Sequence, residues 1–239
     1  MRTTMIALAA AAALLAPSAA LASRDALHGT LLNTTTSSTS SNWSGYAAVS
    51  GKFTSVSASW VQPYALCAGS QTAASFWVGI DGDGSQTVEQ TGTYSNCNAQ
   101  GVPQYYAWFE LYPNPSYKWT YPVSPGDKMS ASVTRDRFGR FKLTISDATQ
   151  HWTGSTTQSS STAQLVSAEV IAEAPSYVSG GIAPLTNFGT VSFTSAKVNG
   201  ATLDDTFTLD KIDMASGGTT KAVTGALSNG AFAVTWQHS

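Results

Sequence analysis

Apolar and polar residues alternate with a period of two along much of this 239-residue chain, and this alternation limits the possible folds more than any other feature. Val56, Ala58 and Trp60 alternate with serines, and 129–133 and 141–145 show the same period. Successive side chains of a strand point to opposite faces of a sheet, so the pattern predicts strands with one buried face. Helical spacing is nearly absent outside the N-terminal segment.

Turn signals separate these runs. The segment 136–139 is a predicted hairpin connection, and Asn229-Gly230 is the strongest two-residue hairpin signal in the chain. Many short strands with turn residues between them predict an all-β fold, an antiparallel β-sandwich. Further strands are expected near 43–49, 74–81, 86–91, 104–112, 165–173, 189–194, 206–214, 220–227 and 231–236.

The N-terminus has the features of a secretory signal peptide. Arg2 provides the positive start, 6–15 is an apolar run, and Ala20-Leu21-Ala22 fits the small-residue cleavage pattern. The apolar run is too short to span a bilayer. We therefore predict a signal peptide at 1–22, a secreted extracellular protein, and no membrane attachment after cleavage.

A second segment precedes the globular part. Residues 23–41 end in eight consecutive Ser/Thr residues and show no apolar periodicity, so we expect a flexible leader or a short propeptide. From 42 to 239 no break in composition appears, and roughly 200 residues suffice for one all-β domain with a sizeable core. We expect this single domain to be a monomer.

Charge and cysteine content narrow the function. The chain has 12 Lys/Arg against 14 Asp/Glu, so it lacks the basic surface that nucleic-acid binding requires, and no nucleic-acid partner is expected. Export permits a disulfide between Cys67 and Cys97, the two cysteines of the chain. Such a bridge closes a loop of about 30 residues and contributes about 3 kcal/mol. The alternative is a pair of buried free thiols.

Several predicted strands place large aromatic, carboxylate and amide side chains on the face opposite the core, where other strands of this chain have Ser and Thr. A sheet surface of this kind is typical of a ligand cleft, and the alternative is an aromatic-rich solvated face. The side chains on this face are Trp77, Asp81, Gln90, Tyr106, Trp108, Glu110, Tyr112, Glu169, Ile171 and Glu173.

The small set of reactive residues excludes most chemistries. The three histidines are His28 in the leader, His151 on a Ser/Thr-rich strand and His238 next to the end, so neither a Ser-His-Asp triad nor a zinc site is expected. The run 81–84 is a turn rather than a calcium loop, because the later ligands are missing. We expect no metal and no cofactor.

Carboxylate chemistry remains, and three of the four glutamates lie on the cleft face. Two reactions fit, namely peptide hydrolysis by a Glu-activated water and glycoside hydrolysis by a carboxylate pair. Glu169 and Glu173 are four residues apart on one strand, which is roughly 13 Å. That distance is too long for a glycosidase pair, so any pair must come from different strands.

At these residues the sequence resembles a known family, the glutamic peptidases called eqolisins, family G1. The matching stretches occur in the family's order and span about 42 to 194. They are Ser41-Asn42-Trp43-Ser44-Gly45-Tyr46, Phe76-Trp77-Val78-Gly79-Ile80-Asp81-Gly82, Gln90-Thr91-Gly92, Tyr106-Ala107-Trp108-Phe109-Glu110-Leu111-Tyr112-Pro113, Ala168-Glu169-Val170-Ile171-Ala172-Glu173 and Asn187-Phe188-Gly189-Thr190-Val191.

The resemblance implies a sandwich of two large antiparallel sheets, similar to concanavalin A-like folds, and a secreted endopeptidase that cleaves polypeptides at acidic pH without metal. It implies a catalytic pair of Gln90 and Glu173. Glu173 would take a proton from the attacking water, and the Gln90 amide would stabilise the oxyanion. The residues it implies for the substrate cleft are Trp77, Asp81, Trp108 and Glu110, and we add Glu169 as a substrate contact or a supporting residue.

Two positions depart from the family pattern. Val170 stands where the family usually has an aromatic residue, which affects packing on the core side. Glu89 replaces a usually apolar residue, and strict alternation points it into the core unless a bulge or a sheet edge intervenes. Two other functions remain open: a carbohydrate-binding or glycan-cleaving sandwich, and a peptide-binding protein without catalytic activity.

Overall fold

The computed structural model describes residues 34–177, 180–205 and 207–239; the signal peptide expected at 1–22 and leader residues 23–33 lie outside them. The described residues contain strands and no helix, so none of them forms a helix that could cross a membrane. The strands are β1 (Thr35–Ser40), β2 (Trp43–Val49), β3 (Ser55–Val61), β4 (Ser75–Ile80), β5 (Val88–Cys97), β6 (Pro103–Tyr112), β7 (Tyr117–Lys118), β8 (Lys128–Arg135), β9 (Arg140–Asp147), β10 (Trp152–Ser159), β11 (Ala168–Glu173), β12 (Thr190–Val198), β13 (Ala201–Thr202), β14 (Thr208–Ser216), β15 (Thr219–Thr224) and β16 (Phe232–Trp236).

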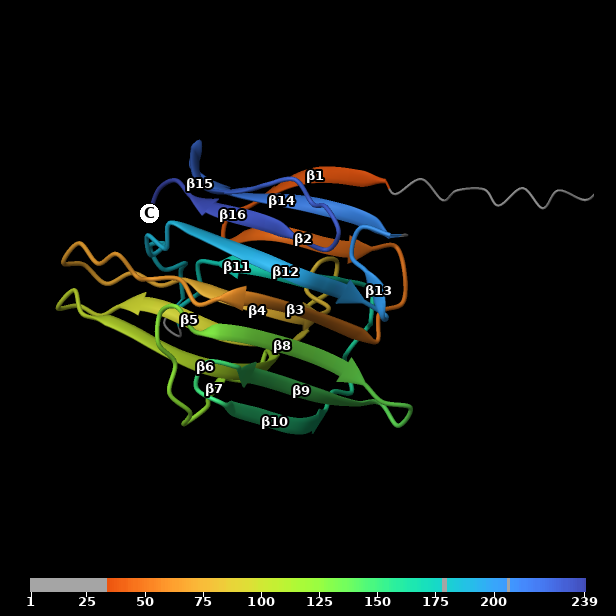
Figure 1. Cartoon of the computed structure of the whole chain (residues 1–239). Helices are drawn as coiled ribbons and strands as arrows, with labels where there is room; N and C mark the ends of the chain where they lie inside the picture. The colour runs from red at the N-terminus through yellow and green to blue at the C-terminus, as the bar shows by residue number, and fades with distance from the viewer. Residues whose placement is uncertain (1–33, 178–179, 206) are drawn as a thin grey trace, which may run out of the picture. The chain divides into compact units, whose positions relative to one another are not determined.

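The strands form one continuous hydrogen-bonded path that folds into two layers. Its order is β10-β9-β8-β3-β12-β16-β15-β14-β2-β11-β4-β5-β6-β7. Strands β3 and β8 contact β4 and β5 across the core, and Figure 1 shows β12, β3, β8 and β9 in a layer over β11, β4 and β5. The predicted antiparallel sandwich is confirmed, although its two layers join through β14 and β15 and are not separate sheets.

The predicted inward residues build the core between the layers. Periodic runs on β3, β8 and β9 alternate between buried and more exposed positions. The facing strand β4 contributes Phe76, Val78 and Ile80, all fully buried, and Val170 of β11 packs in the same core. Burial of these apolar side chains supplies the main driving force of folding and fixes which face of β4, β5, β6 and β11 is left for the cleft.

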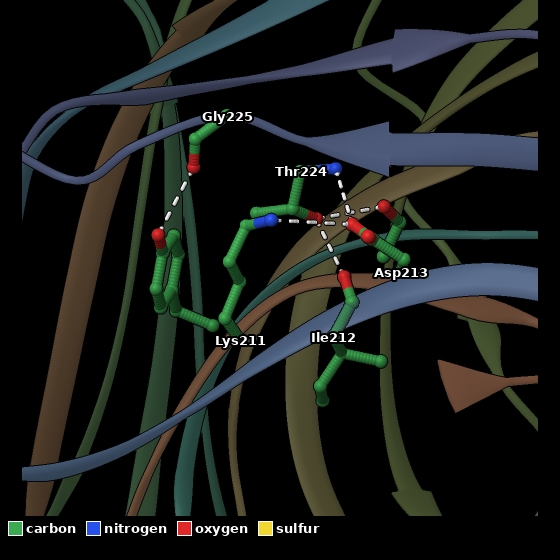
Figure 2. A network of polar contacts seen from close by, with 7 residues as sticks. Lys211, Ile212, Asp213, Thr224 and Gly225 are labelled. Atoms are coloured by element: carbon green, nitrogen blue, oxygen red, sulfur yellow. Dashed lines mark hydrogen bonds and ion pairs between the residues drawn. The ribbon is translucent and has the colours of Figure 1, made fainter. Parts of the chain in front are cut away.

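A polar network joins the two layers where β14 meets β15 (Figure 2). The hydroxyl of Thr224 donates a hydrogen bond of 2.6 Å to the carbonyl of Ile212, and its backbone N–H donates one of 2.7 Å to Asp213 Oδ1. The register between the two strands shifts between Met214 and Ala215. The hydroxyl of Thr224 thus satisfies the carbonyl of Ile212 beyond the last pair of this ladder, Met214 and Ala222.

The disulfide between Cys67 and Cys97 is confirmed. It bridges a sequence separation of 30 residues and ties the loop before β4 to the end of β5. The bridge therefore restrains the segment between β3 and β4, in which Leu66, Thr72 and Ala73 pair only through isolated bridges.

Part of the expected leader is ordered. Thr35–Ser40 forms β1, which pairs in parallel with β14, and the Thr36 hydroxyl donates to the carbonyl of Leu209 at 3.1 Å. The expected flexibility is therefore wrong for 35–40. The sequence pattern missed this strand because its side chains are mostly exposed, and its pairing with β14 holds it without a buried apolar face.

Candidate active site

The outward face of β2, β4, β5, β6 and β11 carries a second apolar cluster, distinct from the core. Its buried members include Trp77, Trp108 and Ile171, and partly exposed Trp43 and Tyr94 pack against it. These side chains come from alternate positions of neighbouring strands, as the period-two pattern predicts. The face that the sequence marked as a ligand cleft is thus a packed aromatic platform and not a solvated surface.

A cleft of about 680 Å³ lies on this platform. Four predicted site residues line it together: Gln90, Trp108, Glu110 and Glu173. The other lining residues are Asn42, Trp43, Val88, Tyr94, Tyr112, Pro113, Asn114, Pro115, Ser116, Pro175, Ser176 and Tyr177. The sequence did not mark most of these other lining residues as candidates. Tyr94 continues the period that starts at Gln90 and was detectable, whereas the loops after β6 and β11 have no periodic signal.

Glu173 is the last residue of β11, and both of its carboxylate oxygens accept a hydrogen bond. The indole N–H of Trp77 donates to Oε2 at 2.8 Å, and the side-chain amide of Asn42 donates to Oε1 at 3.1 Å. The pKa of Glu173 is raised to about 7, chiefly by burial and in part by the like charge of Glu110, while hydrogen bonds from Trp77, Trp43 and Asn42 act in the opposite direction. The carboxylate is therefore fixed in place and ready to exchange a proton near neutral pH.

Gln90 and Glu110 form a second fixed pair. They lie directly opposite each other on β5 and β6, and Gln90 Nε2 donates to Glu110 Oε2 at 2.7 Å. Burial raises the pKa of Glu110 to about 7, and the hydrogen bond from Gln90 opposes this shift. A side-chain amide has two N–H donors, so Gln90 keeps one for another acceptor.

Trp77 lies between Glu173 and the pair formed by Gln90 and Glu110. The register sets Gln90 opposite Gly79 and Glu173 opposite Ser75, with Trp77 at the intervening outward position of β4. A Cβ on Gly79 would come within 2.8 Å of Trp77 Cζ3 and 3.2 Å of the Gln90 Cβ, so the glycine leaves room for the indole. Trp77 is fully buried and holds Glu173, and it does not itself line the cleft.

Asp81 and Glu169 lie outside the cleft lining, although the sequence marked both as substrate contacts. Asp81 is fully buried, and its carboxylate accepts backbone N–H groups of Gln164, Leu165 and Val166 at 2.7–2.9 Å. Glu169 is also fully buried, its Oε1 lies 3.4 Å from the backbone N of Asp83, and burial raises its pKa well above the usual range. This geometry supports a structural role for both, since neither carboxylate reaches the surface of the cleft.

Glu89 takes the position that strict alternation predicts. It is fully buried, opposite Ile80 on β4 and Leu111 on β6, and the register of β5 continues through it without a bulge. Burial raises its pKa to about 7, and the nearby Ser160 side chain opposes this shift in part. Within the described residues, no group of three or more His, Cys, Asp or Glu side chains is placed to hold a metal ion.

Comparison with known proteins shows the family to which this chain belongs. The pattern of the Peptidase A4 family matches residues 41–236. Scytalidopepsin B of Scytalidium lignicola is 41% identical over 96 residues, which is 39% of this chain and 35% of that protein. Aspergillopepsin-2 of Aspergillus niger is 29% identical over 196 residues, covering 70% of this chain and 67% of that protein.

Solved structures of glutamic peptidases superpose on this chain. Scytalido-glutamic peptidase with a transition state analog inhibitor superposes with a TM-score of 0.72 at 27% identity, over 82% of this chain and 98% of that one. Aspergilloglutamic peptidase from Aspergillus niger gives a TM-score of 0.60 at 28% identity, over 70% and 99%. The family pattern covers β2 to β16 and both halves of the site, so the chain belongs to the Peptidase A4 family, the glutamic peptidases or eqolisins.

Proposed function

We propose that this protein is a secreted acid endopeptidase in which Glu173 activates a water molecule and Gln90 stabilises the oxyanion. The observation that carries the proposal is the placement of Glu173 and Gln90 on one cleft, each fixed by a partner of its own. Catalytic groups held by packing and hydrogen bonds need no reorganisation when the reaction begins.

Glu173 would act as general base and then as general acid. Each carboxylate oxygen has two acceptor sites, so the bonds from Trp77 and Asn42 leave one site on each oxygen for a water molecule. The carboxylate takes the proton of that water as the water attacks the scissile carbonyl carbon, and it then delivers the proton to the leaving amine.

Gln90 would hold the oxygen that becomes negative. Its second amide N–H is neutral, and the first is held by Glu110 at 2.7 Å. The pair of Gln90 and Glu110 orients the free donor, which stabilises the tetrahedral intermediate without adding charge to the resting cleft.

The pKa of Glu173 fixes how the rate depends on pH. General base catalysis needs the ionised carboxylate, and a pKa of about 7 leaves only a small ionised fraction in acid. Glu110 faces the same cleft, and its like charge disfavours the ionised form of Glu173. We expect kcat/KM to rise with pH across the acid range until loss of stability ends the rise.

An extended polypeptide fits the surroundings of the cleft. A second hollow, lined in part by Gln71, Asn96 and Tyr106, shares Tyr94 and Tyr177 with the cleft. A further hollow next to β1 shares Asn42 and Trp43 with it. Two hollows therefore adjoin the cleft, as a substrate that extends past the scissile bond requires. The eqolisin SCP-B, a structural relative of this chain, was solved with the tripeptide Ala-Ile-His.

The experiment compares Gln90→Ala with Gln158→Ala, an exposed glutamine on β10 that serves as the matched control. The secreted proteins are incubated with a denatured polypeptide between pH 2 and 7, and the products are quantified by mass spectrometry. We expect Gln90→Ala to lower kcat by about 10²–10³, the usual cost of one oxyanion donor, and Gln158→Ala to leave kcat unchanged.

Two results would contradict the proposal. One is a wild-type rate for Gln90→Ala. The other is release of reducing sugar from polysaccharides without peptide cleavage, which would favour the glycan-cleaving alternative, with Glu110 and Glu173 as a carboxylate pair from different strands.

A further inference from the structure

A short corner precedes β2 and has its own hydrogen-bond pattern. The backbone N–H groups of Asn42 and Trp43 donate to Ser40 Oγ at 3.3 and 3.1 Å, and the Ser40 hydroxyl donates to Asn42 Oδ1 at 3.3 Å. We call these residues the Ser40–Asn42 corner. Because Oδ1 is engaged by Ser40, the amide of Asn42 is turned so that its N–H groups point the other way.

The corner contacts the end of β11 at two points. Asn42 Nδ2 donates to Glu173 Oε1 at 3.1 Å, and the backbone N–H of Ala174, the next residue, donates to the carbonyl of Asn42 at 2.8 Å. The side chain and the backbone of Asn42 therefore hold the residue that the proposed mechanism uses as its base, together with the backbone that follows it.

β1 holds the corner from the other side. It pairs with β14 from Thr35 to Ser40, and the hydroxyls of Thr36 and Ser38 donate to Asp210 on that strand. The match to the family pattern begins at residue 41, so β1 precedes the region that defines the family. This strand ends at Ser40, so its pairing fixes where the corner begins.

We propose that β1 and the Ser40–Asn42 corner are a positioning element for Glu173, and that the active chain retains its residues from Thr35 onward. The inference rests on the proposed function, because it assigns Asn42 a role through Glu173. It adds the requirement that the segment from Thr35 to Ser40 is retained. A chain that begins at residue 41 would keep Gln90 and Glu173 but lose the contacts of Ser40.

The surroundings of Glu173 make the contribution of Asn42 measurable. The titratable groups that face this carboxyl are Glu110 from β6 and Tyr94 from β5, and they do not donate to it in the structure. Its hydrogen-bond donors are Trp77 and Asn42 of the corner, and the Trp43 side chain also favours its charged form. Loss of the Asn42 amide removes a hydrogen bond that favours the charged form, which raises the pKa of Glu173 and moves the rise of kcat/KM to higher pH.

The experiment uses the full chain with Asn42→Ala, Ser40→Ala and Ser40→Thr, and with Ser37→Ala as the matched control. Ser37 is an exposed serine of β1, and it does not line the cleft or either adjoining hollow. We expect Asn42→Ala to lower kcat by about tenfold to a hundredfold with little change in KM, the cost of a hydrogen bond to a charged group. Ser40→Ala lowers kcat less, and Ser40→Thr, which keeps the hydroxyl, stays within about twofold of wild type.

Two further measurements separate positioning from simple stabilisation. The pH profile of kcat/KM should move to higher pH in Asn42→Ala and Ser40→Ala, and it should not move in Ser37→Ala or Ser40→Thr. The mass of the purified active protein should correspond to an N-terminus at or before Thr35. A wild-type profile for Asn42→Ala, or a fully active chain that begins at Ser41 or later, would overturn the inference.

Failure of this inference differs from failure of the proposed function. If Gln90→Ala is inactive while Asn42→Ala keeps the wild-type rate and pH profile, the Gln/Glu mechanism stands and only the positioning role is wrong. If Gln90→Ala has wild-type activity, the proposed function fails first.

Discussion

The indole N–H of Trp77 donates a 2.8 Å hydrogen bond to Glu173 Oε2 from a side chain that is itself fully buried. Trp43 packs against this indole edge to face, with ring centroids 5.0 Å apart. The aromatic platform therefore fixes the orientation of a carboxylate as well as forming a wall for a substrate.

Replacing Trp77 by Phe should lower kcat by about tenfold or more, because a donor to a charged group is lost while most of the ring packing remains. The pKa of Glu173 rises as the donor is removed, so kcat/KM should rise at higher pH than in wild type. Steady-state kinetics between pH 2 and 7 measure both effects. The control is Trp152→Phe, which removes an indole hydrogen bond of 2.8 Å to Pro122 outside the cleft. Equal kinetics for the two variants would show that the indole N–H of Trp77 has no catalytic importance.

Asp81→Ala tests whether Asp81 is structural or binds substrate. Loss of three backbone hydrogen bonds to a buried carboxylate should lower the free energy of unfolding by about 2 kcal/mol or more, with KM unchanged at temperatures where the variant is folded. Urea denaturation and peptide kinetics give the two quantities. The control is Asp136→Ala at an exposed hairpin, which should lower the free energy of unfolding by less. A raised KM with unchanged stability would restore the substrate-binding role that the sequence suggested.

Glu89 should make the protein less stable as the pH rises. Its pKa is about 7 in the folded protein and near 4.5 in an unfolded chain, so the folded state binds more protons between these values. The stabilisation is complete below about pH 4.5 and is lost as the pH approaches 7. Glu89→Gln cannot ionise, so its melting temperature should exceed that of wild type by roughly 6–12 °C at pH 7 and match it at pH 4. An equal pH dependence in both proteins, measured by calorimetry, would exclude this role of Glu89.

Replacing both Cys67 and Cys97 by Ser should lower the free energy of unfolding by about 3 kcal/mol, since the bridge closes a loop of 30 residues in the unfolded chain. Both cysteines lie outside the lining of the main cleft, so the folded variant should keep its kcat. Urea denaturation with and without reductant separates the two effects: reductant should destabilise the wild type and leave the variant unchanged. A variant as stable as the oxidised wild type would contradict this prediction.

The alternation of side chains predicted the sandwich and the faces of its strands well. Phe76, Val78 and Ile80 lie in the core, and Trp77 lies on the opposite face, because the period of a strand determines the side on which each residue is buried. Pairing is decided by contacts far apart in sequence, so the continuous path through β14 and β15 had no local signal.

Strand periodicity also predicted part of the site. Gln90, Trp108, Glu110 and Glu173 line the cleft because they are outward residues of strands whose register brings them together. Asp81 has the same periodicity, but it follows the end of β4 with a φ of 70°, and its carboxylate accepts the backbone N–H groups of 164–166. Asn42 was not marked as a site residue, because its contact with Glu173 depends on a corner and on a strand without an apolar pattern.

The most direct test of the central claim is the rate of Glu173→Gln. Glutamine keeps the size of the side chain and cannot accept the proton of water as a base, so the platform should stay folded while general base catalysis is lost. Circular dichroism and thermal unfolding establish that the variant is folded, and cleavage of a denatured polypeptide is then followed from pH 2 to 7. We expect kcat to fall by at least about 10²–10⁴, the usual contribution of a general base, at every pH. A folded Glu173→Gln protein that cleaves at the wild-type rate would show that another group activates the water.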